Sequence, residues 1–211
     1  MSVRAMLMGA GGASELPIQY IAAASAQTSG SASTLTINKP TGVQSGDLLI
    51  AIMGADAGRT FTDANFTEVA DIGTSPALRV AYRVAGGSEP ATYDFTPNSS
   101  AKLSGCILAY RYAAYDAIGS FATGANPLVI TGPSASVANC RLIGAALRSS
   151  TSITITSPGS MTDRVTDNDA NAPSYLVSDE VLTSSGATGT RSFGMGSSSS
   201  TVGILLTIKP T

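Results

Sequence analysis

Short apolar runs bounded by Gly, Pro, Ser and Asn recur along the whole chain. The most apolar run, residues 48–53 (LLIAIM), follows a turn at residues 40–47 in which Asp47 can bond back to the local backbone. A half-exposed strand would alternate apolar and polar residues, and this run does not. It is also shorter than the about 20 residues that a membrane span requires. The pattern predicts a central strand of one sheet with the small Ala51 facing outward; alternatively, another layer or another subunit covers that outer face.

Several other runs alternate, as strands with one buried side do. In residues 66–72, for example, Phe66, Glu68, Ala70 and Ile72 fall on one face. The predicted strands are residues 18–24, 34–38, 48–53, 66–72, 77–85, 92–95, 103–112, 128–130, 140–147, 153–156, 161–165, 175–182, 191–195 and 202–208.

Short strands at regular spacing, joined by Gly, Pro and Ser turns, predict an all-β fold: an antiparallel, jelly-roll-like β-sandwich. Residues 26–32 and 115–124 are predicted as a turn and a loop. No helix is expected, and no repeat of fixed period is visible, which disfavours a solenoid or a propeller. Residues 18–211 are expected to form a single domain. Residues 1–17 are expected to be an extended N-terminal arm that docks or is flexible, although their short apolar stretch also resembles a cleaved signal peptide.

The turn and strand at residues 40–49, PTGVQSGDLL, and the later segment ALRVAYRVAGGSEPATYDF carry a family resemblance. The pattern, a Pro-x-Gly-Val turn, Gly-Asp-Leu-Leu, Tyr-Arg-x-Ala and Glu-Pro-Ala-Thr-Tyr before a Phe, resembles a β-sandwich domain of bacteriophage virion proteins, especially tail and fibre proteins. It continues more weakly through residues 105–116. Members usually carry Gly-Trp where this chain has Asn65 and Phe66, and the chain has no Trp. The matching residues are Pro40, Gly42, Val43, Gly46, Asp47, Leu48, Leu49, Tyr82, Arg83, Ala85, Glu89, Pro90, Tyr93 and Phe95.

This resemblance implies a non-enzymatic structural protein located in the virion, as a component of the tail, tail fibre, collar or head surface. Its partners would be other virion proteins and further copies of the chain. A fibre would imply a trimer, because fibres in the families that it resembles are commonly trimeric. The matching residues are structural, so they identify a scaffold and no ligand.

Charge is scarce in this chain. Charged residues make up 12% of it, against about 25% in soluble domains. Because a monomer normally keeps charge on its surface, the low value suggests that partners cover much of this surface. The net charge is −2, and Lys39, Lys102 and Lys209 are scattered. No nucleic-acid partner and no membrane insertion are therefore expected.

Candidate chemistry is sparse. The chain has no His, which removes the commonest general base, so no catalytic residue and no cofactor are predicted. Cys106 and Cys140 lie in apolar runs; they are either buried thiols or, if their strands are neighbours, a disulfide. The only oxygen-rich cluster contains Asp167, Asp169 and Asn171, which either bind Ca²⁺ or form a solvated turn.

A carbohydrate-binding or host receptor-binding module is the alternative function, with a host surface glycan as its partner. Sandwich folds often bind sugars through exposed aromatic rings. Tyr112, Tyr115 and Phe121 belong to the only dense aromatic group and are the candidate contacts. The competing interpretation is core packing, because Tyr110 and Tyr112 share the apolar face of their predicted strand.

Overall fold

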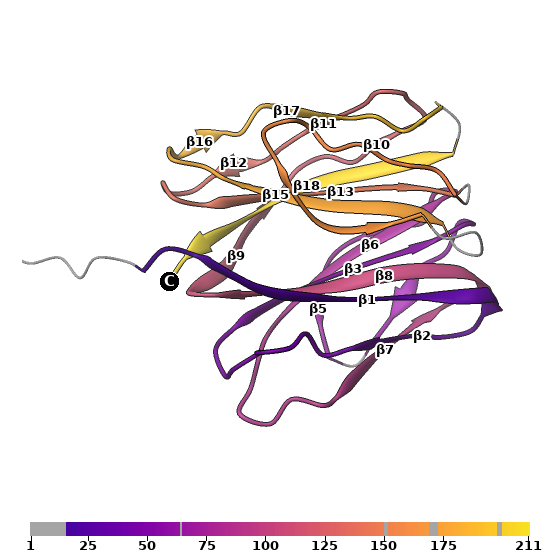
Figure 1. Ribbon diagram of the computed structural model, residues 1–211, viewed down its shortest axis with the longest axis horizontal. Helices are drawn as coiled ribbons and strands as arrows, with labels where there is room; N and C mark the ends of the chain where they lie inside the picture. The colour runs from indigo at the N-terminus through magenta and orange to yellow at the C-terminus, as the bar shows by residue number, and fades with distance from the viewer. Residues whose placement is uncertain (1–15, 64, 150–151, 169–172, 198–199) are drawn as a thin grey trace, which may run out of the picture.

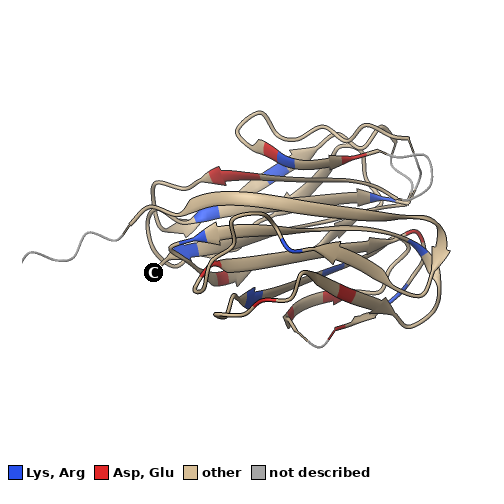
Figure 2. Cartoon of the chain, turned by 60° about the horizontal axis from the view of Figure 1, so that its bottom comes forward, with Lys and Arg blue, Asp and Glu red and all other residues tan. Residues whose placement is uncertain are grey.

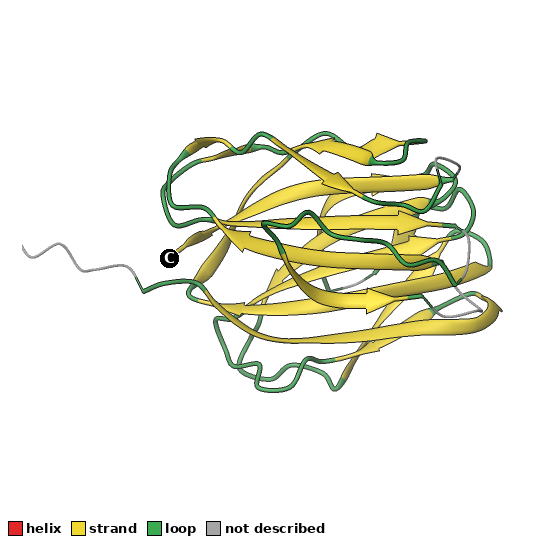
Figure 3. Cartoon of the chain, turned by 45° about the horizontal axis from the view of Figure 1, so that its top comes forward, coloured by secondary structure: helices red, strands yellow, loops and turns green. Residues whose placement is uncertain are grey.

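The expected all-β, sandwich-like class is confirmed. A computed structural model describes residues 16–63, 65–149, 152–168, 173–197 and 200–211, and within these ranges every regular element is a strand (Figure 3). No helix in this part of the chain could span a membrane. The strands are Gln19–Ala32 (β1), Leu35–Asn38 (β2), Leu48–Ala55 (β3), Phe61–Thr62 (β4), Thr67–Ile72 (β5), Ala77–Val84 (β6), Thr92–Pro97 (β7), Ala101–Arg111 (β8), Ala113–Ile118 (β9), Ala122–Thr123 (β10), Leu128–Thr131 (β11), Ser134–Ala135 (β12), Arg141–Arg148 (β13), Thr162–Asp167 (β14), Ser174–Val181 (β15), Gly186–Ala187 (β16), Thr190–Phe193 (β17) and Thr201–Pro210 (β18).

The strands form four layers (Figure 1). Two large antiparallel sheets stack in the middle, one with the order β1-β8-β3-β6-β5 and the other with β10-β18-β13-β15-β14, in which β9 also pairs with β18. The small sheet β2-β7-β4 covers the outside of the first, and the pairs β11-β17 and β12-β16 lie beyond the second.

The two halves of the chain have the same topology. In the first half an edge strand, β1, pairs with the last strand, β8, which pairs with β3, then β6, then β5; in the second, β9 pairs with β18, then β13, β15 and β14. The outer pairs β2-β7 and β11-β17 correspond in the same way. The chain is therefore built as two equivalent units, a repeat that its sequence does not show.

Register confirms this equivalence residue by residue. The edge strand has a β-bulge at Ile21 in the first half and at Asp116 in the second. The opposite edge has one at Val69 and at Arg164. Bulges are local departures from regular pairing, so two of them at matching positions indicate one common backbone plan.

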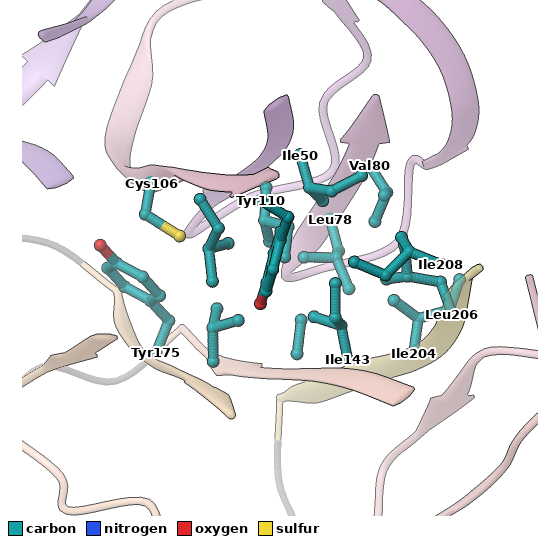
Figure 4. Close-up of a cluster of buried hydrophobic side chains, with 14 of the residues drawn as sticks. Ile50, Leu78, Val80, Cys106, Tyr110, Ile143, Tyr175, Ile204, Leu206 and Ile208 are labelled. Atoms are coloured by element: carbon teal, nitrogen blue, oxygen red, sulfur yellow. The ribbon is translucent and has the colours of Figure 1, made fainter. Parts of the chain in front are cut away.

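Both halves contribute to the central core (Figure 4). Ile50, Leu78 and Tyr110 from the first half face Ile143 and Leu206 from the second, and all five are buried. Burial of such side chains contributes roughly 1.5–3 kcal/mol each. Neither half buries this face without the other.

The outer face of β3 is covered by another layer of the same chain. Ile50 and Ile52 point into the central core, whereas Leu49, Ala51 and Met53 lie beneath the sheet β2-β7-β4 in a second core. All eight residues of β3 are buried for this reason. The run without polar breaks thus reflects apolar contact on both faces.

Four sequence predictions were wrong. Residues 26–32 are not a turn, because β1 continues to Ala32 beside β8, and part of the predicted loop 115–124 is strand β9. In residues 153–156 the structure has only an isolated bridge from Thr156 to Gly194. Phe66 and Ile72 lie in different cores, because the bulge in β5 shifts the alternation by one residue. The predicted arm, up to residue 15, lies outside the described residues.

Candidate functional site

A group of ionisable side chains lies between the two halves. The carboxylate of Asp179, in β15, is fully buried and accepts hydrogen bonds from the Tyr110 hydroxyl at 2.7 Å, Arg141 Nη1 at 3.0 Å and Arg164 Nε at 2.9 Å. The Arg164 guanidinium also lies 4.2 Å from the ring centre of Tyr20. These five residues, called here the Asp179 cluster, link β1 and β8 of the first half to β13, β14 and β15 of the second.

The electrostatics of the Asp179 cluster suit a structural role. Burial, and then the neighbouring Asp179 carboxylate, raise the pKa of Tyr110 well above its usual value, so the hydroxyl stays protonated and donates. Burial likewise raises the pKa of Tyr20. Three donors bind the buried carboxylate and fix its position. The arrangement ties the halves together.

Sequence reasoning missed this cluster, although one signal was available. Alternation along β15 places Tyr175, Val177 and Asp179 on the same face, and the first two belong to the central core. A carboxylate at a core position requires partners, because burying an unpaired charge is costly. The partners themselves come from distant strands and leave no local pattern. Glu180, the next residue, points the other way and pairs with Arg191.

Residues that carry the family resemblance form a second network. The Glu89 carboxylate accepts hydrogen bonds from Arg83, the Tyr93 hydroxyl and the backbone N–H of Gly86. Burial opposes ionisation of Glu89, but these hydrogen bonds outweigh it and lower the pKa of Glu89. Burial, followed by the bond to Glu89, raises the pKa of Tyr93. The network holds the connection between β6 and β7 in place.

The turn before β3 has the geometry predicted for it. Asp47 Oδ2 accepts the backbone N–H of Gln44 at 2.8 Å, which closes the turn and confirms the expected local bond. Arg111, at the end of β8, binds the same carboxylate through Nε at 2.8 Å. Two of the resemblance-bearing segments are thus fixed by ion pairs, one at Asp47 and one at Glu89.

The three candidate sugar contacts lie apart. Tyr112 is the left-handed residue (φ 56°) that joins the two halves, and it lines a hollow of about 270 Å³ beside Asp47 and Arg111. Tyr115 stacks on Tyr82, with ring centres 4.9 Å apart and planes 8° from parallel, so one face of its ring is occupied. Phe121 is 51% exposed. It follows the far end of β9, whose six residues span roughly 20 Å.

A broad hollow of about 650 Å³ lies over β4 and β7. Asp94 in this hollow accepts a hydrogen bond from Thr36 at 2.6 Å, and Asp63 is paired with the buried Arg79 at 2.6 Å. Asp63 is therefore not free to bind a ligand, and the exposed lining is divided about evenly between polar and apolar surface. The lining residues are Thr62, Asp63, Asn65, Pro90, Thr92, Asp94 and Thr96.

The remaining candidates are the predicted Ca²⁺ ligands and the two cysteines. Asp167 ends β14 opposite Tyr175, whereas Asp169 and Asn171 lie outside the described residues. In the part of the chain that is described, no three Cys, Asp or Glu side chains are grouped to hold a metal ion. Cys106 and Cys140 are buried free thiols, and burial raises the pKa of both.

Comparisons with known proteins add no relative. No family model, no curated protein and no solved structure matches this chain.

Proposed function

We propose that the chain is a non-enzymatic structural component of a bacteriophage-type virion, a building block of its tail, tail fibre, collar or head surface. The observation that carries this proposal is the location of the few charged side chains. Of the 12 Lys and Arg residues, seven are in ion pairs inside the described structure. Apart from Glu68, their carboxylate partners are at most 10% exposed.

Internal pairing leaves the surface even less charged than the composition indicates. Figure 2 shows Lys, Arg, Asp and Glu as isolated segments in a chain that is otherwise without charge. A free monomer relies on surface charge for solubility, whereas a subunit inside an assembly has its surface covered. The bonded networks around Asp47 and Glu89, which contain resemblance-bearing residues, also fit a scaffold.

The test is association with particles. Virions released by a host that carries this sequence would be separated on a density gradient, and each fraction would be quantified by mass spectrometry. We expect peptides of this chain to follow the major structural proteins at a constant ratio. Recovery only in the soluble fractions, free of particles, would refute the proposal.

A carbohydrate-binding module is the second candidate, favoured by the exposed ring of Phe121 and by the broad hollow over β4 and β7. A glycan array probed with the full chain tests it. Phe121→Ala should abolish binding, while Val129→Ala, which alters a side chain that is also 51% exposed, should not. A chain that binds no glycan, or binds equally well in both variants, would exclude this use of Phe121.

A further inference from the structure

Strand β1 is an open sheet edge. Ten of its 14 residues pair with β8 along one side, and no other strand of the described part of the chain pairs with it. Figure 1 shows β1 running the length of its sheet. An edge of this kind presents a row of free backbone N–H and C=O groups, which is a template for another strand.

The usual protections of an edge are missing from its central part. The sequence from Leu16 to Asn38 contains no charged residue, and β1 contains no Pro. From Ala22 to Gln27 the pairing with β8 is regular, and this stretch, AAASAQ, has small side chains except for its last residue. Irregularities lie only outside it, at Ile21 and between Gln27 and Ser31.

The second half provides an internal comparison, because the same position in its fold is blunted. There the edge is divided into β9 and β10, which are separated by residues 119–121. Its bulge residue is a charged one, Asp116, which binds the backbone N–H and the hydroxyl of Ser136 and lies 4.0 Å from Lys209. Short strands and inward-pointing charge are devices that prevent edge pairing. The first half has the same plan without them.

We propose that the β1 edge pairs with the β1 edge of a second copy of this chain, antiparallel about a twofold axis. In such a pair a charged residue near the twofold axis would lie close to its own copy, and like charges on facing strands are unfavourable. A segment free of charge avoids this repulsion. It also carries no charge with which to select a different partner. The pairing would join the two five-stranded sheets into one. This proposal does not depend on whether the chain belongs to a virion.

The size of the edge sets the strength of this contact. All fourteen residues extend about 46 Å, so with a layer roughly 10 Å thick the footprint is at most about 460 Å² per copy. The total of about 900 Å² lies below the roughly 1,200 Å² of stable interfaces. The dimer should therefore form in a concentration-dependent way, with a dissociation constant in the micromolar range.

A matched pair of variants tests the proposal on the full chain. Gln27 is exposed and pairs with Ser104, the residue before Gly105. Thr123 occupies the equivalent position in the second half. It is also exposed, and it pairs with Val202, the residue before Gly203. Sedimentation equilibrium should show a monomer–dimer equilibrium for the natural sequence. Gln27→Lys should weaken the dimer about tenfold or more, because Lys on an edge opposes pairing. Thr123→Lys should leave it unchanged.

Hydrogen exchange on the natural chain provides the second readout. Backbone amides within residues 22–27 should become more protected as concentration rises into the micromolar range, while those of β10 should not. A chain that stays monomeric, a trimer, or equal effects of the two Lys variants would overturn the proposal. So would protection that builds up only at another edge.

Discussion

Removing the carboxylate of Asp179 should destabilise the whole molecule. In Asp179→Ala, two Arg side chains and the Tyr110 hydroxyl lose their common acceptor, and two neighbouring cations are left without a counter-charge. Breaking a buried ion pair in this way costs about 3–5 kcal/mol. Because the Arg164 side chain is 21% exposed and partly screened, we take the lower end, about 3 kcal/mol.

Thermal unfolding followed by circular dichroism measures this loss. For a chain of this length about 3 kcal/mol corresponds to a Tm lower by about 6–12 °C. Glu68→Ala is the control, because Glu68 is 55% exposed and lies 3.8 Å from Arg79; it should cost at most about 1 kcal/mol. Tyr110→Phe, which removes one donor and keeps the ring, should fall between the two. If Asp179→Ala loses no more than Glu68→Ala, the Asp179 cluster does not join the halves.

Three further predictions concern pH, packing and the repeat. Because hydrogen bonds lower the pKa of Glu89, its stabilisation is present above the unfolded pKa of about 4.3 and is lost as pH falls through the folded value; Glu89→Gln should therefore flatten the acid limb of a pH–stability curve measured with urea. Gly105→Ala should cost about 1–3 kcal/mol in the same assay, because the new Cβ would lie 2.7 Å from a backbone oxygen, whereas Gly87→Ala, with open space around it, should change stability by less than about 0.5 kcal/mol. Separately produced residues 18–111 and 112–211 should associate into one species with the circular dichroism of the intact chain, and two fragments that remain apart would contradict the shared core.

The sequence predicted those parts of the fold in which each residue has a simple environment. The apolar run of β3 follows from burial on both of its faces. The bond from Asp47 to the Gln44 backbone was predictable because it spans only three residues. Local chemistry decides such features.

Features set by distant contacts were not predictable. The Ser- and Gly-rich end of β1 looks like a turn, but pairing with β8 keeps it extended. A bulge at Val69 shifts the alternation of side chains along β5 by one residue, and no residue there predicts it. The hydrogen-bond donors to Asp179 come from up to 69 residues away. In each case tertiary context overrides local preference.

The repeat is not visible in the sequence for a related reason. The two halves share one backbone geometry but carry different side chains at matching positions. Where β6 of the first half has Arg83 bound to Glu89, β15 of the second has Glu180 bound to Arg191, so a matching position carries opposite charge. The residues that the two halves share are those that the backbone geometry requires. Gly105 and Gly203 occupy equivalent positions, and a Cβ on either would lie within 3.0 Å of a backbone oxygen of the neighbouring strand. Two units that share a backbone plan and differ in side chains can divide tasks between them. On this view the divided, charged edge at β9 and β10 prevents strand pairing in the second half. The uncharged edge at β1 leaves the first half able to pair with a second copy of the chain.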